Sequence, residues 1–229
     1  MALTAIERDF DCLARFDHQG WTGNNHYHNF LLQHVPPQCE RVLEIGCGTG
    51  AFSRALAGRA KYVTAIDLSS EMIRVARSRS QQFAQIAFEV GDIMSRPLPA
   101  AQFDCIATIA TLHHLPQPDL LPKLKEALRP AGRLIVLDLF QAETSLLSTA
   151  GLTDHFLNVV ALGTTGILRL VHNGRLRVPR EARAAWQAHG KTDRYLTMDE
   201  VRSLYASIFP GAVIRKHLLW RYSAVWIKS

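Results

Sequence analysis

The fold is decided by the stretch Val42-Leu43-Glu44-Ile45-Gly46-Cys47-Gly48-Thr49-Gly50. A mostly apolar run ends in a Gly-x-Gly-x-Gly turn, and residues 51–57 then carry apolar side chains at helical spacing. This pattern predicts a buried strand, a tight turn and a helix, which together open a βαβ unit. Glycines suit such a turn because a Cβ would disfavour positive φ and keep a ligand away from the backbone.

A second apolar run follows at residues 62–66 and ends in Asp67. An acidic side chain at the end of this strand can hydrogen-bond the two hydroxyls of a ribose. The glycine turn and this acid together predict a nucleoside-binding α/β domain, whereas the turn alone would fit any strand-turn-helix.

The residues of the turn also indicate which kind of nucleoside binds. A dinucleotide site favours Gly-x-Gly-x-x-Gly, because a pyrophosphate then lies at a helix N-terminus. This chain instead has Glu44 ahead of glycines at 46, 48 and 50. A carboxylate there would repel a pyrophosphate but attract an ammonium or a sulfonium group. The arrangement disfavours a dehydrogenase.

The run from Leu43 to Gly50 resembles motif I of the class I S-adenosylmethionine (SAM) dependent methyltransferases. Later motifs of that family follow in order, and the resemblance is close over residues 25–140. It implies SAM as cofactor and S-adenosylhomocysteine as product. It also implies that Leu68 and Met72 flank the adenine, while the turn Gly91-Asp92-Ile93 binds the adenine edge through the Asp92 carboxylate and the Ile93 backbone N–H.

An N-terminal helix often covers the cofactor pocket in this family. We expect a helix from about Asn25, ending before Pro36-Pro37. Tyr27 or its histidine neighbours would form a wall of the pocket, since aromatic faces are favourable beside a sulfonium. The alternative is a helix that only packs on the sheet.

His113 and His114 follow a fourth apolar strand at residues 103–111. Ligands of open α/β sheets bind outside the carboxyl ends of the strands, so these histidines are predicted to line the acceptor side. Either one could act as a general base, although histidines at such positions are often structural. Asp138 ends a fifth strand and is expected beside them.

The resemblance implies a single α/β domain over residues 1–229. Its doubly wound, mostly parallel sheet should have seven strands, with an antiparallel last strand at 221–227 paired with 212–218. Residues 1–38 would form a helical cap, and residues 141–195 a helical insertion on the substrate side after the fifth strand. The C-terminal segment is also similar to methyltransferase-11-like bacterial enzymes of unassigned substrate.

Two features of the insertion each allow more than one interpretation. The apolar run 156–171 is expected to be a buried lid helix with its apolar face directed towards the acceptor, although it could also touch a membrane surface. Five arginines lie close together and could bind phosphates or form a solvated face: Arg169, Arg175, Arg177, Arg180 and Arg183.

Composition narrows the class of protein further. The net charge of +6 is modest for 229 residues and is spread along the chain, so a nucleic-acid partner is not expected. Four scattered cysteines lack metal-binding spacing, which predicts reduced thiols, no metal site and a cytoplasmic protein. We expect neither a signal peptide nor a membrane span, and either a monomer or a homodimer.

The sequence therefore predicts a SAM-dependent methyltransferase that acts on a small, partly apolar metabolite. Two alternatives stay open. One is a tRNA or other nucleic-acid methyltransferase, which the arginine cluster would favour, and the other is a SAM-binding protein without transfer activity.

Overall fold

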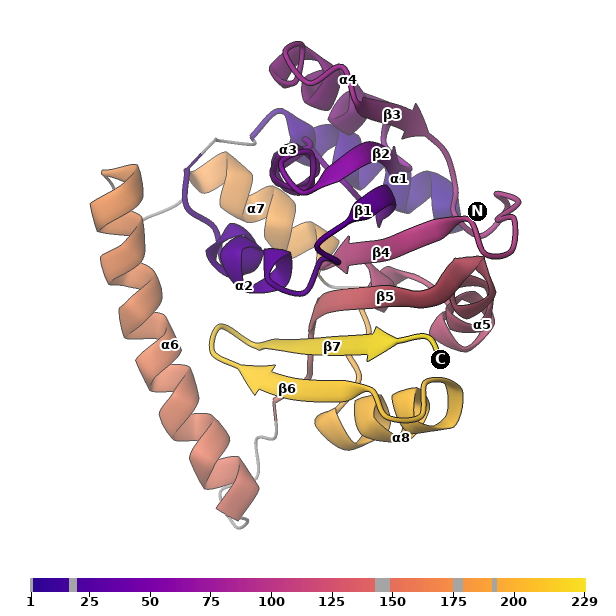
Figure 1. Ribbon diagram of the computed structural model, residues 1–229. Coiled ribbons are helices and arrows are strands. Elements are labelled where there is room, and N and C mark those ends of the chain that lie inside the picture. Colours follow the sequence, from indigo (N-terminus) through magenta and orange to yellow (C-terminus); the bar gives the residue numbers. More distant parts are fainter. Residues whose placement is uncertain (1, 17–19, 143–148, 175–178, 191–192) are drawn as a thin grey trace.

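The structure, a computed structural model, describes residues 2–16, 20–142, 149–174, 179–190 and 193–229. Its centre is a seven-stranded sheet in the order β3-β2-β1-β4-β5-β7-β6 (Figure 1). All strand pairs from β3 to β5 are parallel, and β7 runs antiparallel to both of its neighbours. The expected doubly wound sheet with an antiparallel last strand is confirmed. The strands are β1 Cys39–Ile45, β2 Ala60–Asp67, β3 Ile86–Val90, β4 Phe103–Ile109, β5 Leu128–Leu139, β6 Val213–His217 and β7 Arg221–Ile227.

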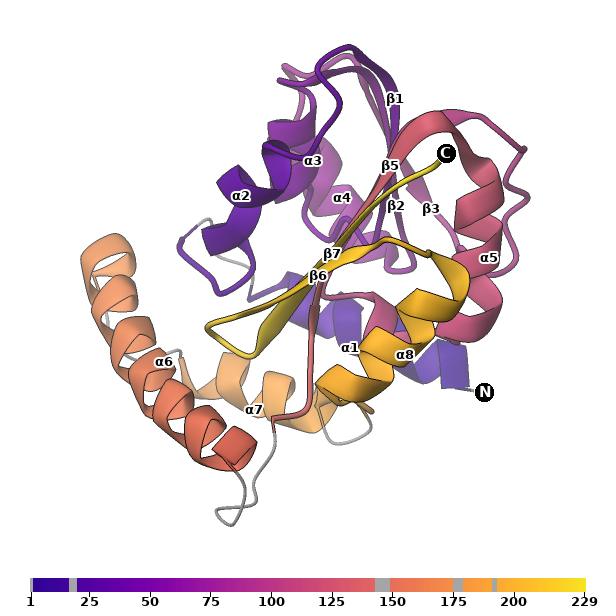
Figure 2. The same cartoon turned by 60° about the horizontal axis from the view of Figure 1, so that its bottom comes forward.

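The central strands are apolar along most of their length because helices cover both faces of a parallel sheet. One face packs against α2 (His28–Leu32), α3 (Ala51–Leu56) and α4 (Ser70–Arg79). The other face packs against α5 (Gln117–Ala127) and α8 (Met198–Ile208). Figure 2 shows α2 and α3 on one side of the sheet, with α5 and α8 on the other.

Side chains cap the N-termini of two helices. Ser69 precedes α4, and its side chain accepts a hydrogen bond from the Met72 backbone N–H. Thr197 precedes α8 and forms a capping box with Glu200. In both helices a side chain within three residues satisfies a backbone N–H of the first turn.

Strand β5 is irregular near its start. It begins at Leu128 and contains residues 129–132. Leu128 pairs with Phe103, and the register of β4 and β5 then shifts before Arg133 pairs with Cys105. Ala131 has a φ of 61° within this irregularity. This segment is therefore a bulge inside a continuous strand.

Further helices lie beyond the carboxyl ends of the parallel strands. α1 (Ala2–Ala14) contacts both α4 and α7 (Arg180–His189). There are also two short 3₁₀ turns: η1 (Asn25–Tyr27) precedes α2, and η2 (Leu112–His114) follows β4. These elements enclose the end of the sheet at which ligands of this fold class bind.

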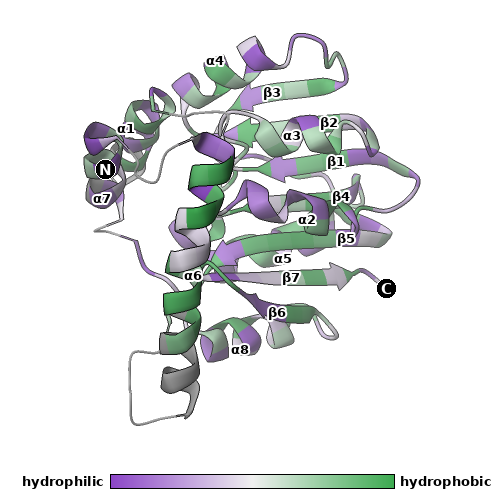
Figure 3. Ribbon diagram, turned by 90° about the vertical axis from the view of Figure 1, so that its left-hand side faces the viewer, coloured by the Kyte–Doolittle hydropathy of each residue, from purple (hydrophilic) through white to green (hydrophobic). Residues whose placement is uncertain are grey.

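The long helix α6 (Thr149–Asn173) stands along one side of the molecule (Figures 1 and 3). Ala161 is buried, and Asn173 exchanges hydrogen bonds with the backbone of Trp21 at 2.7 and 3.0 Å. The larger apolar side chains are exposed instead: Phe156, Val159, Leu162, Ile167, Leu170 and Val171. The expectation of a buried lid helix with its apolar face towards the acceptor is therefore wrong, because the helix meets the body through a small residue and its own end.

Among the helices that the structure describes, none has both the length and the apolar character that crossing a bilayer requires.

Candidate active site

The glycine turn after β1 has the conformation that only glycine adopts readily. Gly46 has a φ of +72°, and Gly48 has a φ of +52°. A Cβ on Gly46 would lie 2.0 Å from the Thr111 hydroxyl oxygen, so this glycine lets the turn pack against the loop after β4. A Cβ on Gly48 would meet no atom within 4 Å. The turn therefore packs against protein at Gly46 and leaves space at Gly48, where a ligand could approach the backbone closely.

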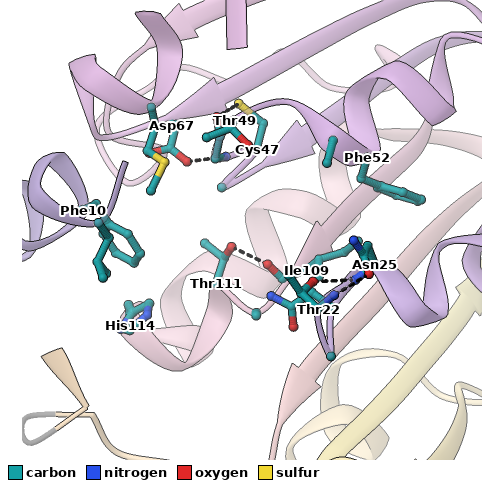
Figure 4. Close-up of a pocket in the computed structure, with 18 of the residues that line it drawn as sticks. Phe10, Thr22, Asn25, Cys47, Thr49, Phe52, Asp67, Ile109, Thr111 and His114 are labelled. Atoms are coloured by element: carbon teal, nitrogen blue, oxygen red, sulfur yellow. Dashed lines mark hydrogen bonds between the residues drawn. The ribbon is translucent and has the colours of Figure 1, made fainter. Parts of the chain in front are cut away.

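Asp67 holds this turn at the carboxyl end of β2. One carboxylate oxygen accepts the Gly48 backbone N–H at 2.7 Å, and the other accepts the Ser69 N–H at 2.9 Å. Burial raises the pKa of Asp67, while these two N–H donors oppose the rise. Figure 4 shows Asp67 beside the turn, next to Thr49. Each carboxylate oxygen has a second lone pair that a ligand hydroxyl could use.

Glu44 lies buried just before the turn and lines the same cavity. Its Oε2 accepts a hydrogen bond of 2.5 Å from the Ser53 hydroxyl. Burial raises the pKa of Glu44 to about 8; the Ser53 hydrogen bond and the charge of Arg54 oppose the rise, and the charge of Asp67 adds to it. A cationic ligand beside Glu44 would favour its ionised form.

His113 is fixed by Asp138 at the other end of the cavity. The Asp138 carboxylate accepts the His113 backbone N–H at 2.9 Å, and its Oδ1 lies 2.6 Å from the ring Nδ1. Both side chains are buried. A carboxylate without a proton only accepts hydrogen bonds, so in a neutral imidazole this contact favours the tautomer with the proton on Nδ1 and the lone pair on Nε2.

His114 belongs to a second polar group beside the first. Its ring centroid lies 3.9 Å from that of His113, and its Nδ1 lies 3.2 Å from Asp193 Oδ1. The Tyr195 hydroxyl donates to Asp193 Oδ2 at 2.9 Å. Burial, followed by the neighbouring His113, lowers the pKa of His114 to about 4. His114 is therefore neutral at physiological pH.

Helix α1 touches both ends of the cavity. The Phe10 ring packs edge-to-face with the rings of His114 and His189, whose centroids lie 5.5 and 4.7 Å away. Its neighbour Asp11 accepts hydrogen bonds from the Ser69 hydroxyl at 2.5 Å and from the Glu71 N–H at 3.2 Å. Figure 4 shows Phe10 next to His114.

These groups surround a cavity of about 760 Å³. Pockets of roughly 300–1,000 Å³ are typical of small-molecule sites. Most of the residues predicted from the sequence line it: Glu44, Gly46, Gly48, Asp67, Leu68, Met72, Asp92, Ile93, His113 and His114.

Three predicted residues lie elsewhere. Tyr27 is buried in the core, where its hydroxyl donates to the Leu218 carbonyl at 2.8 Å, so the cavity wall is formed by its neighbours Asn25 and His28. A Cβ on Gly50 would meet the Phe88 ring at 2.9 Å, which places this glycine against the core. Asp138 lies beside His113, as expected, but it is not among the residues that line the cavity.

Sequence reasoning missed His189, Asp193 and Tyr195, which line the cavity from the end of α7 and the segment after it. No motif indicated these residues, since they lie outside residues 25–140, over which the sequence resembles the family closely. Of the arginine cluster, Arg169 lines the cavity and Arg180 and Arg183 are exposed. Arg175 and Arg177 lie outside the described residues.

Comparisons with known proteins agree with this geometry. A family model described as a methyltransferase domain matches residues 42–132. An uncharacterized methyltransferase of Mycobacterium tuberculosis is 32% identical over 214 residues, which cover 91% of this chain and 97% of that protein. A ubiquinone biosynthesis O-methyltransferase of Xylella fastidiosa is 32% identical over 172 residues, covering 70% of this chain and 64% of that protein.

Solved structures share the fold. The N-methyltransferase NodS from Bradyrhizobium japonicum, crystallised with S-adenosylhomocysteine, superposes with a TM-score of 0.62 at 18% identity and covers 99% of this chain and 98% of its own. With the glycine turn, Asp67 and the relatives at 32% identity pointing to one family, the chain belongs to the class I SAM-dependent methyltransferases.

Proposed function

We propose that this enzyme methylates a hydroxyl group of a small, partly apolar metabolite, and that His113 accepts the hydroxyl proton. The observation that carries the proposal is the buried contact of 2.6 Å between His113 Nδ1 and Asp138 Oδ1. Asp138 keeps Nδ1 protonated, so the Nε2 lone pair is available to an acceptor. A general base contributes typically ~10²–10⁴-fold, and it matters most for an acceptor that must lose a proton.

The other end of the cavity fits SAM. The open space over Gly48 would admit the cofactor to the backbone, Asp67 would hold the ribose and Glu44 the ammonium group of the methionine portion. Leu68 and Met72 would flank the adenine. When bound, SAM supplies a methyl group on a sulfonium, for which a neutral thioether is the leaving group. The chain must then hold the acceptor in line and exclude water.

Cavity size and lining support a metabolite as the acceptor. About 760 Å³ must hold both the cofactor and the acceptor, which favours a small molecule over a nucleic acid. Phe10, Trp21 and Trp186 supply apolar wall on the acceptor side. Relatives named as O-methyltransferases support oxygen as the attacked atom. The four free cysteines support the expected cytoplasmic location, in which we propose a monomer or a homodimer.

Turnover on matched acceptors tests the proposal. Release of S-adenosylhomocysteine is measured with a panel of small phenols and aliphatic alcohols, alongside the corresponding amines and the O-methylated compounds. We expect turnover with at least one hydroxyl compound and none with its O-methylated analogue. Methylation of the amine but not of the hydroxyl partner would contradict the choice of oxygen, and methylation of RNA alone would replace the metabolite by a nucleic acid.

Glu44 predicts a pH dependence of cofactor binding. Its raised pKa of about 8 means that it is largely protonated at pH 6, where it offers an ammonium group no charge. As pH rises from 6 to 8, the ionised fraction grows, and affinity for S-adenosylhomocysteine should rise by at most about tenfold per pH unit. Calorimetric titration of the wild type and of Glu44→Gln checks this. The variant should show a flat profile, whereas parallel profiles would mean that Glu44 does not face the ammonium group.

A further inference from the structure

Three side chains in the acceptor end of the cavity are arranged as metal ligands. His113, His114 and Asp193 each offer one ligand atom, and these atoms all lie within 4.8 Å of one another. The histidines come from η2, and Asp193 follows α7, so the chain brings together groups that are about 80 residues apart. We propose that these three residues bind a divalent transition-metal ion, for which Zn²⁺ is the best match.

The spacing of one ligand pair already suits an ion. His114 Nδ1 and Asp193 Oδ1 are 3.2 Å apart. Two bonds of about 2.1 Å, typical of zinc with imidazole nitrogen and carboxylate oxygen, would span this distance at an angle of about 100° at the metal. That angle lies between the octahedral and the tetrahedral values. Because Asp138 holds Nδ1, we assign the third ligand to Nε2 of His113.

Two further residues hold the ligands in the way that metal sites require. The Asp138 carboxylate accepts from the His113 ring at 2.6 Å, which orients Nε2 and raises its basicity. Tyr195 donates to Asp193 Oδ2 at 2.9 Å, which leaves Oδ1 for the ion. All three ligands are largely buried but line the cavity. An ion held by them would keep coordination positions open towards the acceptor.

Two imidazoles and one carboxylate suit zinc and its neighbours better than magnesium or calcium, which prefer oxygen ligands. With three protein ligands and an open position, the site has the composition of a catalytic rather than a structural zinc site. His189 lies next to the group, with its Nε2 3.9 Å from Asp193 Oδ2, but it is not one of the three ligands. It therefore provides a matched control.

The role of the ion rests on the proposed hydroxyl acceptor, whereas the binding of the ion does not. The acceptor oxygen would take the open position, where the ion would act as a Lewis acid. It would lower the pKa of the acceptor hydroxyl, so that the hydroxyl could lose its proton to solvent near neutral pH. With an ion bound, His113 Nε2 would be a ligand and could not accept the proton, so the ion would replace His113 in activating the acceptor.

Metal binding is tested on chelator-treated full-length protein by titration with Zn²⁺ and, for its visible spectrum, with Co²⁺. We expect one saturable site at micromolar concentration or below, and a Co²⁺ spectrum of low coordination number. Asp193→Asn and His114→Gln should each lower the affinity by about 100-fold. Asp138→Asn should lower it by about 10–100-fold, the usual effect of removing a group that orients a ligand.

The control variant His189→Gln should bind the ion within about threefold of the wild type. Affinity for S-adenosylhomocysteine is measured for every variant and reports whether the fold is intact. A wild type that binds S-adenosylhomocysteine but no ion at one site would overturn the metal site and leave the proposed function standing. Equal ion affinity of Asp193→Asn and the wild type would also overturn it. Loss of S-adenosylhomocysteine binding by the wild type would instead contradict the cofactor half of the proposed function.

Discussion

Replacing Gly46 by alanine is expected to abolish measurable SAM binding and to lower the free energy of unfolding by about 2–5 kcal/mol. The added Cβ would lie 2.0 Å from the Thr111 hydroxyl oxygen and 2.5 Å from its Cγ2, so the turn or the loop after β4 must move. Such overpacking costs typically about 1–3 kcal/mol. The positive φ adds about 1–2 kcal/mol for a residue with a side chain. Denaturant unfolding and calorimetric titration measure the two effects.

Gly48→Ala is the matched control for this prediction. Its Cβ would meet no protein atom within 4 Å, so only the cost of the positive φ applies, and most of the stability should remain. Binding should nevertheless weaken by more than tenfold, since the methyl group occupies the open side of the turn. If Gly48→Ala bound S-adenosylhomocysteine as tightly as the wild type, the cofactor would not approach this part of the backbone.

Replacing Asp138 by asparagine is expected to lower kcat by about 10²–10⁴-fold, the range for loss of a positioned general base. The amide cannot accept from all three groups that Asp138 now satisfies, namely the His113 ring, the His113 N–H and the Leu139 N–H. The His113 ring would then lose its fixed tautomer. This result follows whether His113 accepts the proton itself or holds an ion, because both roles need a protonated Nδ1.

Steady-state kinetics with the hydroxyl acceptor checks the Asp138 prediction. KM and the affinity for S-adenosylhomocysteine should stay within about tenfold of the wild type, as expected for an interaction that acts in the transition state. His113→Gln should reproduce the loss of kcat without removing the buried carboxylate. An unchanged kcat in both variants would mean that His113 and Asp138 have a structural role and take no part in catalysis.

The cofactor half of the site could be predicted because its residues are adjacent in sequence to the elements that position them. Gly46 and Gly48 directly follow β1, and Asp67 ends β2, so a strand and the residue after it were enough. His113 was found in the same way, from its place after β4. In each case the parallel sheet brings strand ends to one edge, and no long-range packing had to be foreseen.

The acceptor half could not be predicted as completely because it depends on tertiary packing. Asp193 contacts His114 and follows α7, which packs on α1. Neither helix carries a sequence motif from which this contact could be predicted. Tyr27 was assigned to the wall although its hydroxyl bonds Leu218, which lies in the turn before β7. The hydrophobic periodicity and the composition of α6 also do not predict which side of the helix packs against the rest of the domain, since the buried residue there is Ala161.

The position of α1 has a consequence for how the two halves of the site can change. Free energies of substitutions at distant, independent sites usually add, whereas residues in one contact network do not. Residues around Asp67 and residues around Asp193 come from different segments, so acceptor choice can diversify while cofactor affinity is conserved. The adjacent pair Phe10 and Asp11 joins the two networks through one helix. Epistasis between cofactor and acceptor mutations should therefore concentrate on this single turn of α1.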